Sequence, residues 1–271
     1  MEPKINCLDF NDMQDCFVCG LSSGLRVYTT DPLVEKINLN SKIVGSVKIA
    51  TILRRSNLLA VVTDNDTIVY HNDPRTNLPS KVGVKYLSDT LLIWDDLKKK
   101  FVLEINMDSP ISAGQAWGAT MRLEGVSLSH ILQTYIPTFR LIVVTSRQIT
   151  IFSFPGKLEK IFSVETRYNP KGLCDISVEP TMEYLVFPAF KLGAVQITDL
   201  QEISPICSTS PLTINAHQNE ITCLAINRSG NVLATASTRT CPGTLIRLFD
   251  AQKRDLIAQL RRGSDPATFY W

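Results

Sequence analysis

The sequence predicts an all-β fold built as a β-propeller of about five blades. Three observations lead to this prediction: short apolar strands recur along the chain, their endings resemble one another, and helical periodicity is almost absent. Turn-forming residues such as Ser22-Ser23-Gly24 interrupt the chain at short intervals, as antiparallel strands require. With 271 residues and a hydrophobic content of 44%, the chain is long enough for one large domain with a sizeable core.

Five strand endings carry the repeat. Each places an aromatic residue or a threonine where a WD repeat places its Trp-Asp ending, and successive endings lie 46 to 66 residues apart. A WD repeat needs about 40–45 residues for its four strands. The spacing therefore predicts one blade per ending, with insertions in the longer steps. The endings are centred on Tyr28, Trp94, Phe152, Thr198 and Phe249.

Each unit also has a predicted inner strand upstream of its ending. These strands are at residues 16–20, 57–62, 140–145, 184–187 and 232–237. Residues 71–82 are polar and rich in proline, so we expect an exposed loop there. Residues 112–138 fit no blade strand cleanly, show weak helical spacing at 126–136, and form a predicted insertion. The last residues, 264–271, are expected to begin a sixth blade.

Charge and hydropathy limit the possible partners. A net charge of +2 gives no general case for nucleic-acid binding, so any anion site must be a local patch. The N-terminus lacks the apolar region of a signal peptide, and the longest apolar runs have the length of strands, too short to cross a bilayer. We therefore expect a cytoplasmic protein without a transmembrane segment.

Catalytic and metal-binding motifs are not apparent. The seven cysteines have no framework spacing, which fits reduced thiols, and Cys16 and Cys19 alone cannot supply the four ligands of a structural zinc site. The phosphate-binding loop, the hydrolase elbow and the zinc-protease helix motif do not occur, and the three histidines are far apart in the sequence. The sequence therefore predicts neither an enzyme nor a metal or cofactor site.

Two consecutive arginines follow the last strand ending. Arg261 and Arg262 precede Gly263 at the end of an apolar run, and side chains alternate faces along a strand, so the two guanidinium groups should point in opposite directions. Each group is permanently charged and can bind a phosphate through two parallel hydrogen bonds. The pair is therefore a candidate for binding phosphates in two neighbouring clefts. A solvated Arg-Arg pair is the alternative.

Several stretches resemble the PROPPIN family, and within it the WIPI group, most closely WIPI-three and WIPI-four. The Arg-Arg-Gly motif after a Phe-Asp ending is that family's signature. The resemblance implies a seven-bladed WD-repeat propeller, of which this chain would be a single truncated domain spanning residues 1–271 with an open ring. The matching segments are residues 23–28, 31–33, 54–60, 92–96, 169–175, 214–218, 243–250, 260–263 and 265–268.

The resemblance also implies a phosphoinositide-binding site. In the family's first pocket, arginines supply charge, hydroxyls donate hydrogen bonds, and a glycine lets the head group approach closely. The matching positions here are His217, Ser237, Gly243, Thr244, Arg247 and Arg261, while Arg262 and Gly263 lead toward a second pocket. For the histidine, an internal role in bracing a WD blade is an equal alternative.

The function implied by the resemblance is that of a scaffold in autophagosome formation. Such a scaffold binds phosphatidylinositol 3-phosphate or 3,5-bisphosphate, is recruited peripherally to preautophagosomal and endosomal membranes, and brings an autophagy lipid-transfer protein with it. Asn11, Asp12 and Asp15 lie in the region that matches the family's partner-docking edge. The alternative is a WD-repeat scaffold for protein interactions without lipid binding. The Arg-Arg-Gly motif distinguishes the two, since a general WD scaffold does not need it.

Overall fold

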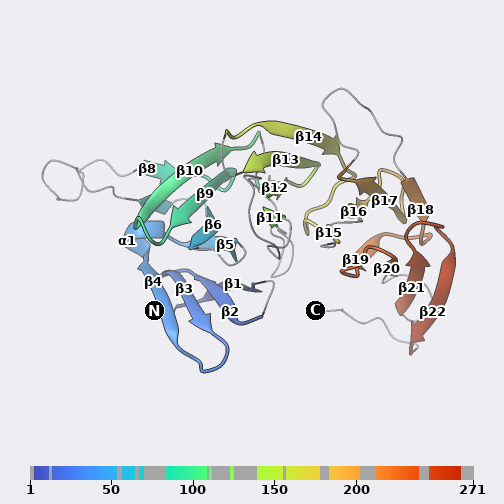
Figure 1. Ribbon diagram of the computed structural model, residues 1–271, viewed down its shortest axis with the longest axis horizontal. Coiled ribbons are helices and arrows are strands. Elements are labelled where there is room, and N and C mark those ends of the chain that lie inside the picture. The colour runs from blue at the N-terminus through green and yellow to red at the C-terminus, as the bar shows by residue number, and fades with distance from the viewer. Residues whose placement is uncertain are drawn as a thin grey trace, which may run out of the picture. The chain divides into compact units, whose positions relative to one another are not determined.

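The computed structural model is almost entirely β-structure (Figure 1). It describes residues 3–11, 14–53, 57–64, 67–69, 84–108, 110–111, 123–124, 139–154, 157–177, 183–201, 212–237 and 244–263. Five four-stranded antiparallel sheets follow one another along the chain. They fall into two compact units, Met1–Met121 and Arg122–Trp271, each of which is described by itself.

The first unit contains two of the sheets. The first sheet has the order β1 (Ile5–Phe10), β2 (Cys16–Leu21), β3 (Gly24–Thr29) and β4 (Glu35–Asn40), and the second has the order β10 (Lys100–Asn106), β9 (Thr90–Asp95), β6 (Leu58–Thr63) and β5 (Val47–Ile52). A one-turn helix, α1 (Ser41–Val44), connects them, and the side chain of Asn40 caps it by accepting from the amide of Lys42.

The second unit contains three sheets, each in chain order. The third is β11 (Leu123–Glu124), β12 (Phe139–Val144), β13 (Gln148–Phe154) and β14 (Lys160–Glu165). The fourth is β15 (Asp175–Ile176), β16 (Tyr184–Pro188), β17 (Ala194–Asp199) and β18 (Leu212–Asn215). The fifth is β19 (Ile221–Ile226), β20 (Val232–Ser237), β21 (Thr244–Asp250) and β22 (Leu256–Arg262).

Neighbouring sheets within each unit pack face to face. In the second unit, buried Val186 and Val195 of the fourth sheet share one cluster with Leu233 and Phe249 of the fifth. Because successive side chains of a strand point to opposite faces, each interior strand can contribute to the packing on both sides. Burial of these apolar side chains holds one sheet against the next and thereby positions the polar side chains at the sheet ends.

The predicted strand pattern is confirmed. All five predicted endings lie in the third strand of a sheet, namely β3, β9, β13, β17 and β21, and the strands predicted upstream are interior strands of the same sheets. The five sheets also match the expected number of blades. Residues 71–82 and 264–271 lie outside the described residues, and the open ring stays a prediction.

Three short elements were not predicted from the sequence. One is the helix α1, and another is the two-stranded pair β7 (Thr67–Val69) and β8 (Val84–Tyr86), which interrupts the second sheet between β6 and β9. The third is β11, which lies inside the predicted insertion 112–138 and pairs with β12 as an edge of the third sheet. Two residues are too few to show a strand period. No helix in the described part of the chain is long and apolar enough to cross a membrane.

Candidate anion-binding site

The register of the fifth sheet brings several predicted site residues onto one face. Ser237 of β20 lies opposite Leu245 of β21, which lies opposite Arg261 of β22. Because side chains alternate, the positions two residues away share that face. They form a second row consisting of Thr235, Arg247 and Gln259. Residues that are distant in the sequence thus meet at one end of the sheet.

Arg247 is held in place by two hydrogen bonds. Its Nη1 donates to the carbonyl of Ala216 at 2.5 Å, and its Nε donates to Oε1 of Gln259 at 3.0 Å. A guanidinium group has five N–H donors, so three remain for another acceptor. The side chain is half-buried, which reduces solvent screening of its charge. Arg247 is therefore an oriented cation with free donors on the face shared with Arg261.

His217 lies inside the protein. Its side chain is 8% exposed, and its Nε2 is 2.9 Å from Oγ1 of Thr235, whose hydroxyl lies 3.4 Å from the carbonyl of Arg247. Since that hydroxyl donates to the carbonyl, its oxygen accepts a hydrogen bond from Nε2–H. Burial and the nearby Arg247 cation lower the pKa of His217 to about 4, so the imidazole is neutral at pH 7. These contacts are those of a histidine that braces the blade, and donation to a phosphate stays a prediction.

Ser237 and Arg261 are the two members of the first row with polar side chains. Ser237 is 4% exposed, and its Oγ has no hydrogen-bond partner within the described ranges. A buried hydroxyl without a partner costs about 1–3 kcal/mol, which a hydrogen bond to an acceptor would recover. Arg261 is exposed and forms no ion pair with any other residue that the structure describes. The row therefore offers an unused hydroxyl and an unused guanidinium group.

The remaining predicted residues are described in part. The backbone of Arg262 pairs with Thr244 at the position next to Arg261, but the side chains of both lie outside the described residues, as does Gly243. The opposite orientation of the two arginines therefore stays a prediction. Gly263 has a φ of 53°, a left-handed conformation that favours glycine, and nothing lies within 4 Å of the position of an added Cβ.

Two residues of this face were missed at first. Thr235 binds His217, and Gln259 binds Arg247. The signal was present in the sequence, because each lies two positions before a predicted residue, Ser237 or Arg261, on the same strand. Strand alternation would have found both, given the strand boundaries.

The predicted partner-docking edge lies in the other unit, at the turn between β1 and β2. Asn11 is 7% exposed, and its side chain is used within the turn: Nδ2 donates to Oδ1 of Asp15 at 2.5 Å, and Oδ1 accepts from the amide of Cys16 at 3.1 Å. Asn11 therefore stabilises the turn, and Asp15 provides an exposed charge. Asp12 lies outside the described residues.

Five consecutive four-stranded antiparallel sheets, each following the chain apart from the β7–β8 insertion, define a β-propeller of the WD-repeat class. The model of the PROPPIN family matches residues 123–268, more than half of the chain, and thus includes the arginine pair and the whole face described above. The chain belongs to the PROPPIN family.

Relatives match over nearly the whole chain. SVP1-like protein 2 of Pichia angusta is 32% identical over 269 residues, which are 98% of this chain and 63% of the relative. Autophagy-related protein 18e of Arabidopsis thaliana is 27% identical over 268 residues, 98% of this chain and 59% of the relative. The solved structure of Kluyveromyces lactis Hsv2 with complete loop 6CD has a TM-score of 0.67 at 22% identity, covering 98% of this chain and 65% of that one. The chain thus spans less than two thirds of the length of these proteins.

Proposed function

We propose that this chain is a phosphoinositide-binding scaffold that acts in autophagosome formation. One observation carries the proposal: Arg261 is exposed and lies on the same sheet face as the anchored Arg247 and the buried hydroxyl of Ser237, and among the described residues Arg261 has no ion-pair partner and Ser237 no hydrogen-bond partner. Two guanidinium groups and a hydroxyl are the donors that a phosphorylated inositol head group needs. Membership of the PROPPIN family and the similarity to an autophagy-related protein support the same function.

The surroundings of Arg261 favour a lipid surface over a free phosphate. On β22, Leu256, Ile257 and Leu260 are 50%, 56% and 53% exposed. Because side chains alternate, Leu260 points to the sheet face opposite Arg261, so the strand as a whole combines exposed apolar side chains with an exposed cation. That combination favours contact with a membrane surface. We propose phosphatidylinositol 3-phosphate and phosphatidylinositol 3,5-bisphosphate as the ligands, with peripheral recruitment to preautophagosomal and endosomal membranes.

Flotation with liposomes tests the proposal. The variant carrying Arg261→Thr and Arg262→Thr should lose binding to liposomes that contain phosphatidylinositol 3-phosphate. Each charge-assisted contact contributes about 1.5–3 kcal/mol, so losing two should weaken binding by about a hundredfold to ten-thousandfold. The control carries Arg228→Thr and Lys253→Thr, which remove the same charge from exposed turns of the same sheet. Unchanged binding by the arginine variant would favour the alternative, a protein-interaction propeller without lipid binding.

We further propose that an autophagy lipid-transfer protein docks at the turn between β1 and β2. The exposed carboxylate of Asp15 supports this, together with the matching position of Asp12. Asn11 is left unchanged because its Oδ1 accepts from the amide of Cys16, a bond within the turn that does not involve the carboxylate of Asp15. Replacing both aspartates by lysine should weaken a pull-down of the partner and leave liposome flotation intact. An undiminished pull-down would exclude this edge as the docking site.

A further inference from the structure

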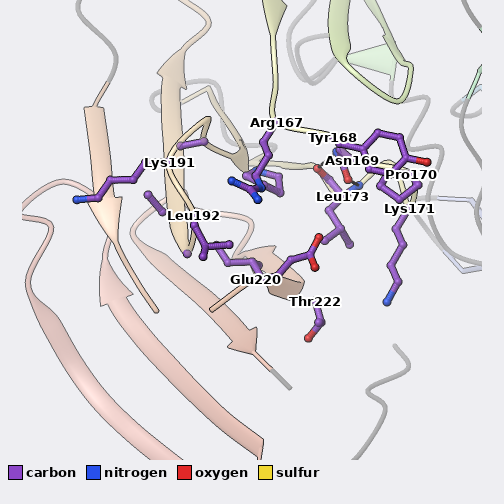
Figure 2. A pocket seen from close by; sticks show the side chains of 15 residues that line it. Arg167, Tyr168, Asn169, Pro170, Lys171, Leu173, Lys191, Leu192, Glu220 and Thr222 are labelled. Carbon is purple, nitrogen blue, oxygen red and sulfur yellow. Dashed lines mark hydrogen bonds between the residues drawn. The ribbon is translucent and has the colours of Figure 1, made fainter. Parts of the chain in front are cut away.

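A second candidate site lies in the unit Arg122–Trp271. It is separate from the face of the fifth sheet that carries Arg247 and Arg261, which we call the arginine face. It is a cavity of about 360 Å³ formed by the loop from β14 to β15, the turn from β16 to β17, and the beginning of β19 (Figure 2). Its walls include Leu173, Pro188, Ala189 and Ile221. Ligand pockets commonly span about 300–1,000 Å³, so this one has room for one or two peptide side chains.

The rim of this pocket carries an excess of positive charge. Arg167, Lys171 and Lys191 are exposed, and none of their side chains forms an ion pair or a hydrogen bond with another residue in the described ranges. Glu220 is the one carboxylate among the lining residues and is likewise unpaired. In Figure 2, Lys171 and Lys191 project on opposite sides of the pocket with Glu220 between them. The three cations are thus available to bind an acidic ligand.

Exposed apolar side chains lie on the loops that build the pocket, and two of them, Tyr168 and Leu192, line it. Tyr168, Phe190 and Leu192 are 57%, 75% and 43% exposed, and all three come from the two loops that build the pocket. The guanidinium carbon of Arg147 lies 5.6 Å from the centre of the Tyr168 ring, a cation–π contact that helps to hold the ring. Exposed apolar side chains on the two loops of a pocket are typical of an interaction surface.

The loops are fixed before any ligand arrives. Asn169 is 3% exposed and clamps its own loop: Nδ2 donates to the carbonyl of Leu173 at 3.0 Å, and Oδ1 accepts from the amide of Leu173 at 2.8 Å. In the other loop, the amide of Ala189 donates to the carbonyl of Ala194 at 2.8 Å. A rigid pocket loses little conformational entropy on binding.

We propose that this pocket docks an acidic peptide segment of a partner protein. One apolar side chain of the segment occupies the cavity, and carboxylates on either side pair with Arg167, Lys171 and Lys191. The cavity is concave with apolar walls, a shape that a flat bilayer cannot fill and a protruding side chain can. Glu220 repels a polyanion such as nucleic acid, whereas its carboxylate can accept a hydrogen bond from a peptide N–H. This inference does not depend on lipid binding by the arginine face.

Selection from a random dodecapeptide library displayed on phage, with the full chain as target, is the first test. The expected result is enrichment of sequences that combine an apolar residue with flanking Asp or Glu. A selected peptide is then synthesised with a fluorophore, and its dissociation constant is measured by fluorescence polarisation. Affinity should fall as salt is raised, because the rim charges are exposed. A library that yields no enriched sequence, or basic sequences, would overturn the proposal.

A charge-reversal variant of the pocket and a matched control distinguish binding at the pocket from a general effect of net charge. Arg167→Glu with Lys171→Glu should raise the dissociation constant at least about tenfold, which corresponds to about 1.4 kcal/mol. The control, Arg228→Glu with Lys253→Glu, changes the net charge equally outside the pocket and should leave affinity unchanged. Phe190→Ser tests the apolar rim with little risk to folding, since this side chain is 75% exposed, and it should also weaken binding.

The contrary outcomes are equally specific. Equal peptide affinity of the pocket variant and its control would show that the peptide does not bind at the pocket. A membrane surface would be shown by a different pattern: no peptide selected, and binding to phosphatidylserine-containing vesicles that is lost in the Arg167→Glu, Lys171→Glu variant and retained in the control. Either result would contradict docking of a peptide here.

Discussion

Gly193 lines the pocket with the cationic rim (the basic pocket) and lies against the backbone of His217, the histidine that braces the fifth sheet. Replacement of Gly193 by alanine should be severely destabilising. Its φ is 72°, and an added Cβ would lie 1.9 Å from the carbonyl oxygen of His217 and 2.9 Å from that of Asn219. Both oxygens belong to the backbone, so no side-chain rotation can relieve the overlap. The two segments are also joined by a hydrogen bond of 2.8 Å from the amide of His217 to the carbonyl of Gly193.

The structure gives the approximate loss in the free energy of unfolding that Gly193→Ala should cause. A left-handed φ costs a residue with a Cβ about 1–2 kcal/mol. Relief of the overlap requires a shift of about 1.5 Å, since ordinary contact with His217 would begin at 3.4 Å. Such a shift breaks the hydrogen bond, at about 1 kcal/mol, and loosens the packing around buried Ala216. Gly193→Ala should therefore lower the free energy of unfolding by about 4 kcal/mol.

Gly263→Ala is the matched control. Its φ of 53° is also left-handed, but the added Cβ would meet nothing within 4 Å, so about 1–2 kcal/mol is expected from the backbone alone. Urea unfolding followed by far-ultraviolet circular dichroism measures both variants against the parent chain. Equal destabilisation of the two would show that the close approach of Gly193 to His217 does not contribute, and would refute this reasoning.

The remaining predictions concern the same unit, and each is measured by urea unfolding. The pKa of His217 is about 4 in the folded chain, below its ordinary value of 6.5, so the unfolded chain binds a proton first as the pH falls. The free energy of unfolding should therefore decrease between about pH 6.5 and pH 4. In the His217→Gln variant this decrease should be less steep. Thr235→Val leaves the Nε2–H of His217 buried without its acceptor and should cost about 2 kcal/mol, whereas Thr213→Val, on the exposed side of β18, should be nearly neutral. Phe187→Ala empties a fully buried position and should cost about 3–5 kcal/mol, in contrast to Phe190→Ala at an exposed one. A flat pH profile for the parent chain, or equal effects within either pair, would contradict the corresponding assignment.

The strands could be predicted from the sequence because their signal is local. A run such as Leu245 to Asp250 shows its apolar alternation and its ending within a few residues, and β21 lies where that pattern places it. The elements that were missed have no such signal. The strand β11 is two residues long, and α1 is a single turn whose clearest sign is the cap at Asn40.

The sites were less predictable because they depend on which strands pair. Arg261 was found from the Arg-Arg motif and Arg247 through the family resemblance, while Thr235 and Gln259 emerge from the register of three strands. The basic pocket had no signature at all. Its charged residues, which include Arg167, Lys191 and Glu220, are separated by dozens of residues and converge through the packing of two loops and a strand.

The connection from β18 to β19 supports both candidate sites. The carbonyl of Ala216 accepts from Arg247 of the arginine face, and the amide of His217 donates to Gly193 of the pocket wall. A change in this connection would therefore disturb the two sites together, and a loss of lipid binding in such a variant would not show which residues touch lipid. Exposed residues avoid this ambiguity: Arg261 belongs to the arginine face alone, and Lys171 to the pocket alone. If lipid binding and peptide binding are separate functions, each of these two charges should affect one of them and leave the other intact.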